Sequence, residues 1–149
     1  MFFCLRIDLD YVPWDTPDAN EFGHGEPAML IRILELARTT GFKFQFFVSN
    51  RVLRAFPTQA DAVLNEGHDL DWLCKHPDVP GARFEEAKVE FDSLGHTPIG
   101  FALRSAWPPD VEFVEALQAM KFVSGPAGPV PAGLRHFVVE GRPIREVAR

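Results

Sequence analysis

Short apolar runs alternate with segments of helical periodicity along the chain, and this alternation is the feature that most restricts the possible folds. Strands are predicted at 2–9, 42–48, 68–72, 99–103, 122–123 and 134–139. Helices are predicted from 27 to about 39, in a broken stretch up to 65, at 84–94 and at 110–120, with loops at 13–26, 77–81 and 125–133. Strands separated by helices usually pair in parallel, because each helix carries the chain back across the sheet. The sequence therefore predicts an α/β fold with mainly parallel strands, either an open sheet or an incomplete barrel.

Length and composition favour one domain, residues 1–149, and limit its partners. With 46% hydrophobic residues the chain can bury a sizeable core. The net charge is −6 and the basic residues are scattered, so no nucleic-acid partner is expected. The first apolar run is too short for a membrane span and lacks the basic flank of a signal peptide, which predicts a cytoplasmic location. Cys4 and Cys74 are then expected to be reduced.

Two carboxylates close the first predicted strand. Asp8 and Asp10 are separated by one residue, so both point to the same face of the strand at its carboxyl end. That end of the strands is where α/β sheets and barrels place their chemistry. Two like charges this close repel, and a folded site relieves the repulsion with a bound cation, a shifted pKa or a basic partner. The alternative is that one carboxylate caps the following turn and the other is solvated.

The ends of the other strands add further polar groups. These groups are Ser49 and Asn50 after the second strand, Asp69 and Asp71 in the third, His76 after it, and Arg104 after the fourth. The carboxyl ends of parallel strands meet at one edge, and this mixture of groups is typical of metal-assisted hydrolysis. Mixed Asp and His ligation suits zinc or another divalent transition metal, whereas a set of carboxylates alone would suit magnesium.

Tryptophans also follow predicted strand ends, at Trp14, Trp72 and Trp107. Aromatic rings in such places can stack on the apolar face of a sugar, or they can cover the core. Both interpretations stay open from the sequence.

The order of these motifs resembles the polysaccharide deacetylases, the NodB-like carbohydrate esterases. The resemblance runs from about residue 3 to residue 107 and is carried by LRIDLD (5–10), the helix from Pro27, GFKFQFFV (41–48), EGHDLD (66–71), His76-Pro77 and GFALRS (100–105). The first fifty residues are most similar to the lipid-linked aminoarabinose deformylases. The resemblance implies a shortened, incomplete (β/α) barrel and a metal-dependent hydrolase that removes an N- or O-acyl group from a carbohydrate or small acylated sugar. It also implies that Asp8 is the general base, Asp10 a metal ligand, and Arg104 the residue that holds the base.

The chain departs from the family in its second motif. The family pattern has two metal-binding histidines separated by three residues, and His76 matches the second of them. Trp72 or Leu73, depending on the placement of a one-residue gap, stands where the first is expected. The nearest substitute ligands are His68, Asp71 and His24, with His136 in the last strand as the one candidate for a late histidine motif. His68 has the alternative role of a hydrogen-bonding residue of the scaffold.

Two alternative functions remain. The first is a catalytically silent deacetylase-like domain that binds a sugar or a protein partner and keeps only the fold, as the missing histidine suggests. The second is a phosphatase similar to the haloacid dehalogenases, in which Asp8 attacks phosphorus, Asp10 protonates the leaving group and Ser49 binds the phosphoryl group. This second alternative lacks the expected lysine between Ser49 and the acidic pair at 69 and 71. A truncated barrel would also leave apolar edges that a second copy of the chain could cover.

Overall fold

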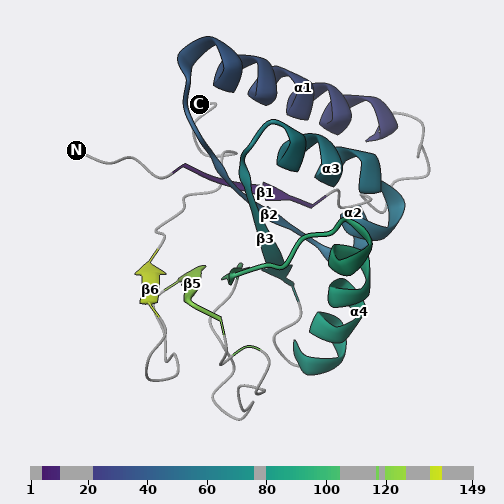
Figure 1. The fold of residues 1–149 in the computed structure, drawn as a ribbon, viewed down its shortest axis with the longest axis vertical. Coiled ribbons are helices and arrows are strands. Elements are labelled where there is room, and N and C mark those ends of the chain that lie inside the picture. The colour runs from purple at the N-terminus through teal and green to yellow at the C-terminus, as the bar shows by residue number, and fades with distance from the viewer. Residues whose placement is uncertain are drawn as a thin grey trace, which may run out of the picture.

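The computed structural model describes residues 5–10, 22–75, 80–104, 117, 120–126 and 135–138, with the backbone alone at 22–28, 80–81 and 135–138. The strands are β1 (Arg6–Leu9), β2 (Gln45–Val48), β3 (Asp69–Cys74), β4 (Gly100–Leu103), β5 (Phe122–Gly125) and β6 (Arg135–Val138). The helices are α1 (Phe22–Thr40), α2 (Asn50–Ala55), α3 (Pro57–Asn65) and α4 (Pro80–Ser93) (Figure 1).

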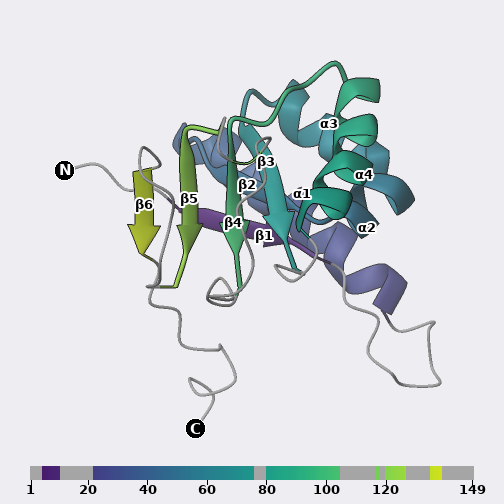
Figure 2. The ribbon, with the colours of Figure 1, turned by 90° about the horizontal axis from the view of Figure 1, so that it is seen from below.

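The six strands form one sheet in the order of the sequence, β1-β2-β3-β4-β5-β6, and every neighbouring pair is parallel. Because crossovers between parallel strands are right-handed and the order never reverses, successive helices are placed on the same face of the sheet. Figure 2 shows β3 to β6 pointing in one direction, with the helices gathered on one side. The predicted α/β fold with mainly parallel strands is confirmed, and the architecture is that of a shortened (β/α) barrel.

The contacts of the Arg6 side chain show that the sheet is curled. Arg6 in β1 donates to the carbonyl oxygens of Leu103 in β4 (3.1 Å) and Ser124 in β5 (3.0 Å). Neighbouring strands lie about 4.8 Å apart, so a flat sheet would separate β1 from β5 by roughly 19 Å. An arginine side chain is far shorter than that. The sheet therefore curls until the inner faces of its first and fifth strands meet.

Two apolar clusters lie on opposite faces of the sheet. The larger cluster joins the sheet to the helices and includes Leu9, Leu34, Phe46, Val48, Val52, Leu70, Trp72, Phe91, Phe101 and Val123. The smaller cluster lies on the inner face and consists of Phe47, Leu73 and Ala102, with Phe122 packed against them. The other described side chains on this face are polar and include Arg6, Asp8, Gln45, Asp71 and Ser124.

Helix boundaries differ from the predicted ones at two places. Helix α1 begins at Phe22 rather than at Pro27, and α4 begins at Pro80 rather than at Phe84, so parts of two predicted loops are helical. Extending an existing helix adds one hydrogen bond per residue. This gain can hold residues of weak intrinsic helix propensity in the helix. Proline fits the first position of a helix, as at the start of α4.

The predicted break in the helical stretch up to residue 65 is confirmed. Helix α2 ends at Ala55, and α3 begins two residues later at Pro57. The residue before a proline is driven out of the helical conformation, which explains the break. Within the predicted helix at 110–120, the described residues are Leu117 and Met120, and both are buried.

Two glycines end helices where the chain turns into a strand. Gly41 follows α1 with φ 73° and Gly67 follows α3 with φ 71°. Residues with a Cβ are strained in this left-handed region, and glycine is not. The predicted end of the first helix at Gly41 is therefore explained by its backbone conformation.

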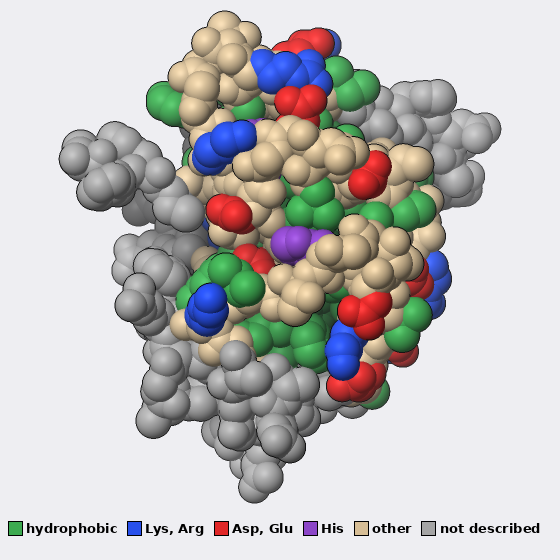
Figure 3. Space-filling view, in the orientation of Figure 1, with side chains coloured by type: hydrophobic (Ala, Val, Ile, Leu, Met, Phe, Trp, Pro, Cys, Tyr) green, Lys and Arg blue, Asp and Glu red, His purple; other side chains and the backbone are tan. Residues whose placement is uncertain are grey.

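The surface carries charges of both signs. On the face seen in Figure 3, basic and acidic side chains are interspersed rather than gathered into a patch of one sign. Among the described helices, none combines the length and the apolar character needed to cross a bilayer.

Candidate functional site

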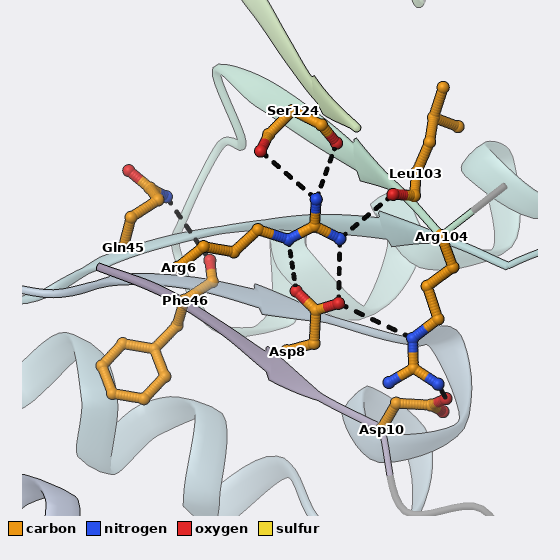
Figure 4. A network of polar contacts seen from close by, with 8 residues as sticks. All are labelled: Arg6, Asp8, Asp10, Gln45, Phe46, Leu103, Arg104 and Ser124. Carbon is orange, nitrogen blue, oxygen red and sulfur yellow. Dashed lines mark hydrogen bonds and ion pairs between the residues drawn. The ribbon is translucent and has the colours of Figure 1, made fainter. Parts of the chain in front are cut away.

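Asp8 is held by an arginine two residues before it. Side chains alternate along β1, so Arg6 and Asp8 share the inner face of the curled sheet. Arg6 Nε lies 2.7 Å from Asp8 Oδ1 and Nη2 lies 2.8 Å from Oδ2, a bidentate pair (Figure 4). The remaining nitrogen of Arg6, Nη1, donates to Ser124. Both oxygens of Asp8 are thus fixed in position while 21% of its side chain stays exposed.

Asp10 is held by two cations from other strand ends. Its side chain has no exposed surface, and its Oδ2 lies 2.9 Å from Lys75 Nζ and 2.8 Å from Arg104 Nη1. These contacts are ion pairs rather than aligned hydrogen bonds, and Oδ1 has no hydrogen-bond partner among the described residues. Arg104 also lies 3.6 Å from Asp8 through Nε, so it bridges the two carboxylates but lies closer to Asp10.

Three basic side chains relieve the repulsion between the two carboxylates. Arg6, Lys75 and Arg104 carry three positive charges against the two negative charges of Asp8 and Asp10. The sequence left a bound cation, a shifted pKa and a basic partner as ways to relieve this repulsion, and the structure shows basic partners. Arg104 remains 42% exposed and Lys75 29% exposed, so the cluster presents cationic groups to the surface.

Asp71 also points to the inner face, but its hydrogen bonds are structural. Its Oδ1 accepts from the backbone N–H groups of Ile99 (2.6 Å) and Gly100 (2.9 Å), and its Oδ2 accepts from Gln45 Nε2 (2.8 Å). Burial raises the pKa of this carboxyl, and these hydrogen bonds partly offset the increase. Asp71 therefore fastens the start of β4 to β3.

His68 lies at the opposite edge of the sheet from Asp10. It precedes β3, whose first residue pairs with Gln45, which in turn pairs with Arg6. His68 is therefore level with Leu5 of the first strand, five residues before Asp10, which corresponds to roughly 16 Å along the strands. The two residues therefore do not form one metal site.

The environment of His68 suits the scaffold role instead. Its Nδ1 accepts from the Phe44 N–H (3.4 Å), and its ring packs beside Phe44 and Phe46. Burial lowers the pKa of His68, and Lys43 lowers it further. The buried ring is therefore favoured in its neutral form.

Trp72 and Leu73 lie on opposite faces of the sheet. Trp72 shares a row with Leu9 and Val48 and points to the helix-covered face, where its side chain is fully buried. It therefore offers no ring face to a ligand, in contrast to the predicted stacking role. Leu73, one residue further, points to the inner face at the level of Asp10. Of the two positions at which the resemblance predicts a histidine, Leu73 is the one that faces the carboxylates.

Ser49 and Asn50 connect the elements around the site. Ser49 caps α2, because its Oγ accepts from the Val52 N–H (3.4 Å). Asn50 Oδ1 accepts from Trp72 Nε1 (2.7 Å), and its Nδ2 donates to the carbonyl of Arg83 in α4 (2.6 Å). These contacts assign both residues to holding the strand ends and helices together.

The described residues alone do not form a donor set for the metal predicted from the sequence. Within the part of the chain that the structure describes, no group of three or more His, Cys, Asp or Glu side chains is placed to hold an ion. Lys75 and Arg104 face the Asp10 oxygen that a metal would use. His76, Trp14 and Trp107 lie outside the described residues, as do the side chains of His24 and His136.

Sequence reasoning missed Arg6 and Lys75. A signal for Arg6 was present, because the alternation Arg6-Ile7-Asp8 places the guanidinium beside the carboxylate on one face. No local signal points to Lys75, which meets Asp10 only through the pairing of three strands. A scan of the chain against protein-family models finds no match, and neither does a search of the curated proteins.

Proposed function

We propose that this chain is a polysaccharide-deacetylase-like domain that binds a carbohydrate at the carboxyl ends of its strands without hydrolysing it. The observation that carries the proposal is the pairing of Asp10 with Lys75 and Arg104, at 2.9 and 2.8 Å. In a metal-dependent deacetylase this carboxylate would have to ligate the ion. Two fixed cations neutralise it instead, and they would repel a divalent metal.

The exposed heads of the cluster suit a hydroxylated ligand. Asp8 offers carboxylate oxygens that accept hydrogen bonds, and the half-exposed guanidinium of Arg104 offers donors. Asp10 is buried and positions Arg104 rather than touching the ligand. Neighbouring donors and acceptors of this kind match the hydroxyl groups of a sugar, which donate and accept at the same time.

The phosphatase alternative is weaker in this arrangement. Asp8 would have to attack phosphorus, yet Arg6 pairs with both of its oxygens and lowers their nucleophilicity, while each oxygen can still accept a further hydrogen bond from a sugar hydroxyl. Ser49, the expected phosphoryl ligand, is 2% exposed and caps α2. The active deacetylase is kept as the second candidate because Asp10 Oδ1 has no hydrogen-bond partner among the described residues.

A first experiment measures metal content and hydrolysis together. The purified chain is analysed for zinc by elemental analysis and incubated with N-acetylated amino-sugar oligomers while acetate release is followed. We expect far less than one zinc per chain and no acetate release. One zinc per chain with acetate release would establish the active deacetylase.

A second experiment places a histidine at each of the two candidate positions. Leu73→His puts an imidazole on the inner face at the level of Asp10, whereas Trp72→His puts it in the helix-side core and serves as the matched control. We expect zinc binding only with Leu73→His, strengthened by the added substitution Lys75→Ala because this removes a competing cation. Equal zinc binding by both variants would contradict the proposed geometry.

Carbohydrate binding itself is tested by calorimetry with acylated oligosaccharides. Asp8→Ala should abolish the binding, whereas Asp69→Ala, which removes an exposed carboxylate at the other end of the sheet, should leave it unchanged. Absence of saturable binding to the wild-type chain would refute the proposal.

A further inference from the structure

A concavity lies beside the carboxylate cluster, with Lys75 common to both. It is open to solvent on one side, has a volume of about 420 Å³, and is lined by the carboxyl ends of β2 and β3 and by the helices α2 and α4. Figure 1 shows α2 and α4 next to each other at this end of the sheet. The volume is within the range of roughly 300 to 1,000 Å³ that is typical of small-molecule sites.

The charge of its walls is the opposite of the charge of the chain. Among the described residues, four basic side chains and one acidic side chain line the cavity: Arg51, Arg54, Lys75, Arg83 and Glu86. Four positive charges and one negative charge give +3 for these lining residues, in a chain whose net charge is −6. Glu90 and Asp10, which lie 3.6 Å from Arg54 and 2.9 Å from Lys75, offset part of this positive charge from outside the lining. Such a concentration of one sign in a concave site attracts ligands of the other sign.

Much of the hydrogen-bonding capacity of these cations is unused. Arg51 forms no ion pair with the described residues, and Arg54 meets Glu86 and Glu90 only at 3.8 and 3.6 Å. Arg83 pairs with Glu86 through Nη1 alone. Each guanidinium has five N–H donors in a planar fork, so most of these donors are available to a ligand.

The walls are also fixed before any ligand binds. Asn50 ties α4 to α2 through the carbonyl of Arg83 at 2.6 Å, and the indole of Trp72 holds Asn50 at 2.7 Å. Of the four cations, Lys75 is held by Asp10 and Arg83 by Glu86, so these two lose less side-chain entropy when a ligand binds than Arg51 and Arg54 do.

We infer that this cavity binds the phosphate group of a small phosphorylated molecule. A phosphate monoester carries about −1.5 to −2 charges at pH 7 and three acceptor oxygens, which matches several guanidinium forks better than a single carboxylate does. The inference goes beyond the proposed carbohydrate site, which rests on Asp8 and Asp10.

The test measures binding of inorganic phosphate and glucose 6-phosphate to the full chain by calorimetry at constant ionic strength. We expect saturable binding of both, and Arg51→Gln and Arg54→Gln should each raise the dissociation constants on the order of tenfold. The matched control is Lys88→Gln, which removes an exposed cation of α4 that does not line the cavity. It should change the dissociation constants less than twofold.

Three outcomes would overturn the inference. They are no saturable binding of either probe, an equal loss in the Lys88→Gln variant, and equally tight binding of glucuronate, which would indicate a carboxylate site. The variant Asp8→Ala separates the two proposals, because its loss of acylated-sugar binding should leave phosphate binding intact. Circular dichroism of each variant identifies any that fails to fold, and Arg83→Gln then replaces it.

Discussion

Asp8 and Asp10 end the same short strand, yet their surroundings give them different tasks. Asp8 is bonded by Arg6 and remains partly exposed, so it can contact a ligand. Asp10 has no exposed surface and holds Lys75 and Arg104. Two carboxylates on the same face of one strand thus have different roles: Asp8 can contact a ligand, and Asp10 positions the basic side chains.

Replacing Asp8 should lower stability as well as binding. Asp8→Asn leaves the partly buried guanidinium of Arg6 without its charged partner, so we expect a loss of about 2 kcal/mol in the free energy of unfolding. Thermal and urea denaturation measure it. Asp69→Asn, at an exposed carboxylate, is the control and should stay within about 0.5 kcal/mol of wild type. An unchanged or higher stability of Asp8→Asn would mean that carboxylate repulsion outweighs the Arg6 pair.

The pH dependence of stability should carry a contribution from His68. Its pKa is lowered in the folded chain by burial, so the unfolded chain binds the proton more readily. Stability is therefore lost as the pH falls below the unfolded pKa of about 6.5, by at most about 1.4 kcal/mol per pH unit. Asp71 has a raised folded pKa, so its contribution has the opposite sign: stability is lost as the pH rises above about 3.9.

The comparison of wild type with His68→Gln isolates the histidine. The side-chain amide does not titrate, and Asp71 is present in both chains. Urea denaturation at a series of pH values between 7.5 and 5 should show a smaller acid-induced loss in the variant. An identical slope in the two chains would show that His68 is protonated equally in the folded and unfolded states.

At the scale of elements, Asn50 joins β3, α2 and α4. Asn50→Ala removes the acceptor of the Trp72 indole N–H and leaves that donor unsatisfied in the core. We expect a loss of about 1 to 3 kcal/mol in the free energy of unfolding. Asn65→Ala is the control, because among the described residues that exposed side chain bonds Asp61 alone, on the same helix. Denaturation followed by tryptophan fluorescence measures both, and equal effects would contradict the proposed linkage.

The elements were largely predictable from the sequence because their signals are local. Two-residue alternation placed Asp8 and Asp10 on one face, and Gly41 marked the end of α1. The register between strands is not local. The register decides which residue of β3 lies level with Asp10. In this structure that residue is Leu73, so Leu73 faces the site and Trp72 faces the core. The alternation alone could not choose between these two positions.

At the scale of the whole molecule, Arg6 connects the first strand to the fourth and fifth. Arg6→Met should cost more stability than Asp8→Asn, about 3 to 5 kcal/mol, because it leaves the Asp8 carboxylate and two carbonyls of other strands without their donor. Chemical denaturation of both variants tests the order. A smaller loss for Arg6→Met would mean that backbone pairing alone maintains the curl.

The same arginine sets a limit on when the fold can be completed. Its acceptors Leu103 and Ser124 lie 97 and 118 residues further along the chain, so these contacts close very long loops during folding. Contacts of this kind tend to form after the transition state, and their removal then accelerates unfolding more than it slows folding. On a ribosome, the guanidinium of Arg6 can meet both acceptors only after Ser124 has been synthesised. We therefore expect Arg6→Met to shorten the lifetime of the native state more than it slows folding, which unfolding and refolding rates measure separately.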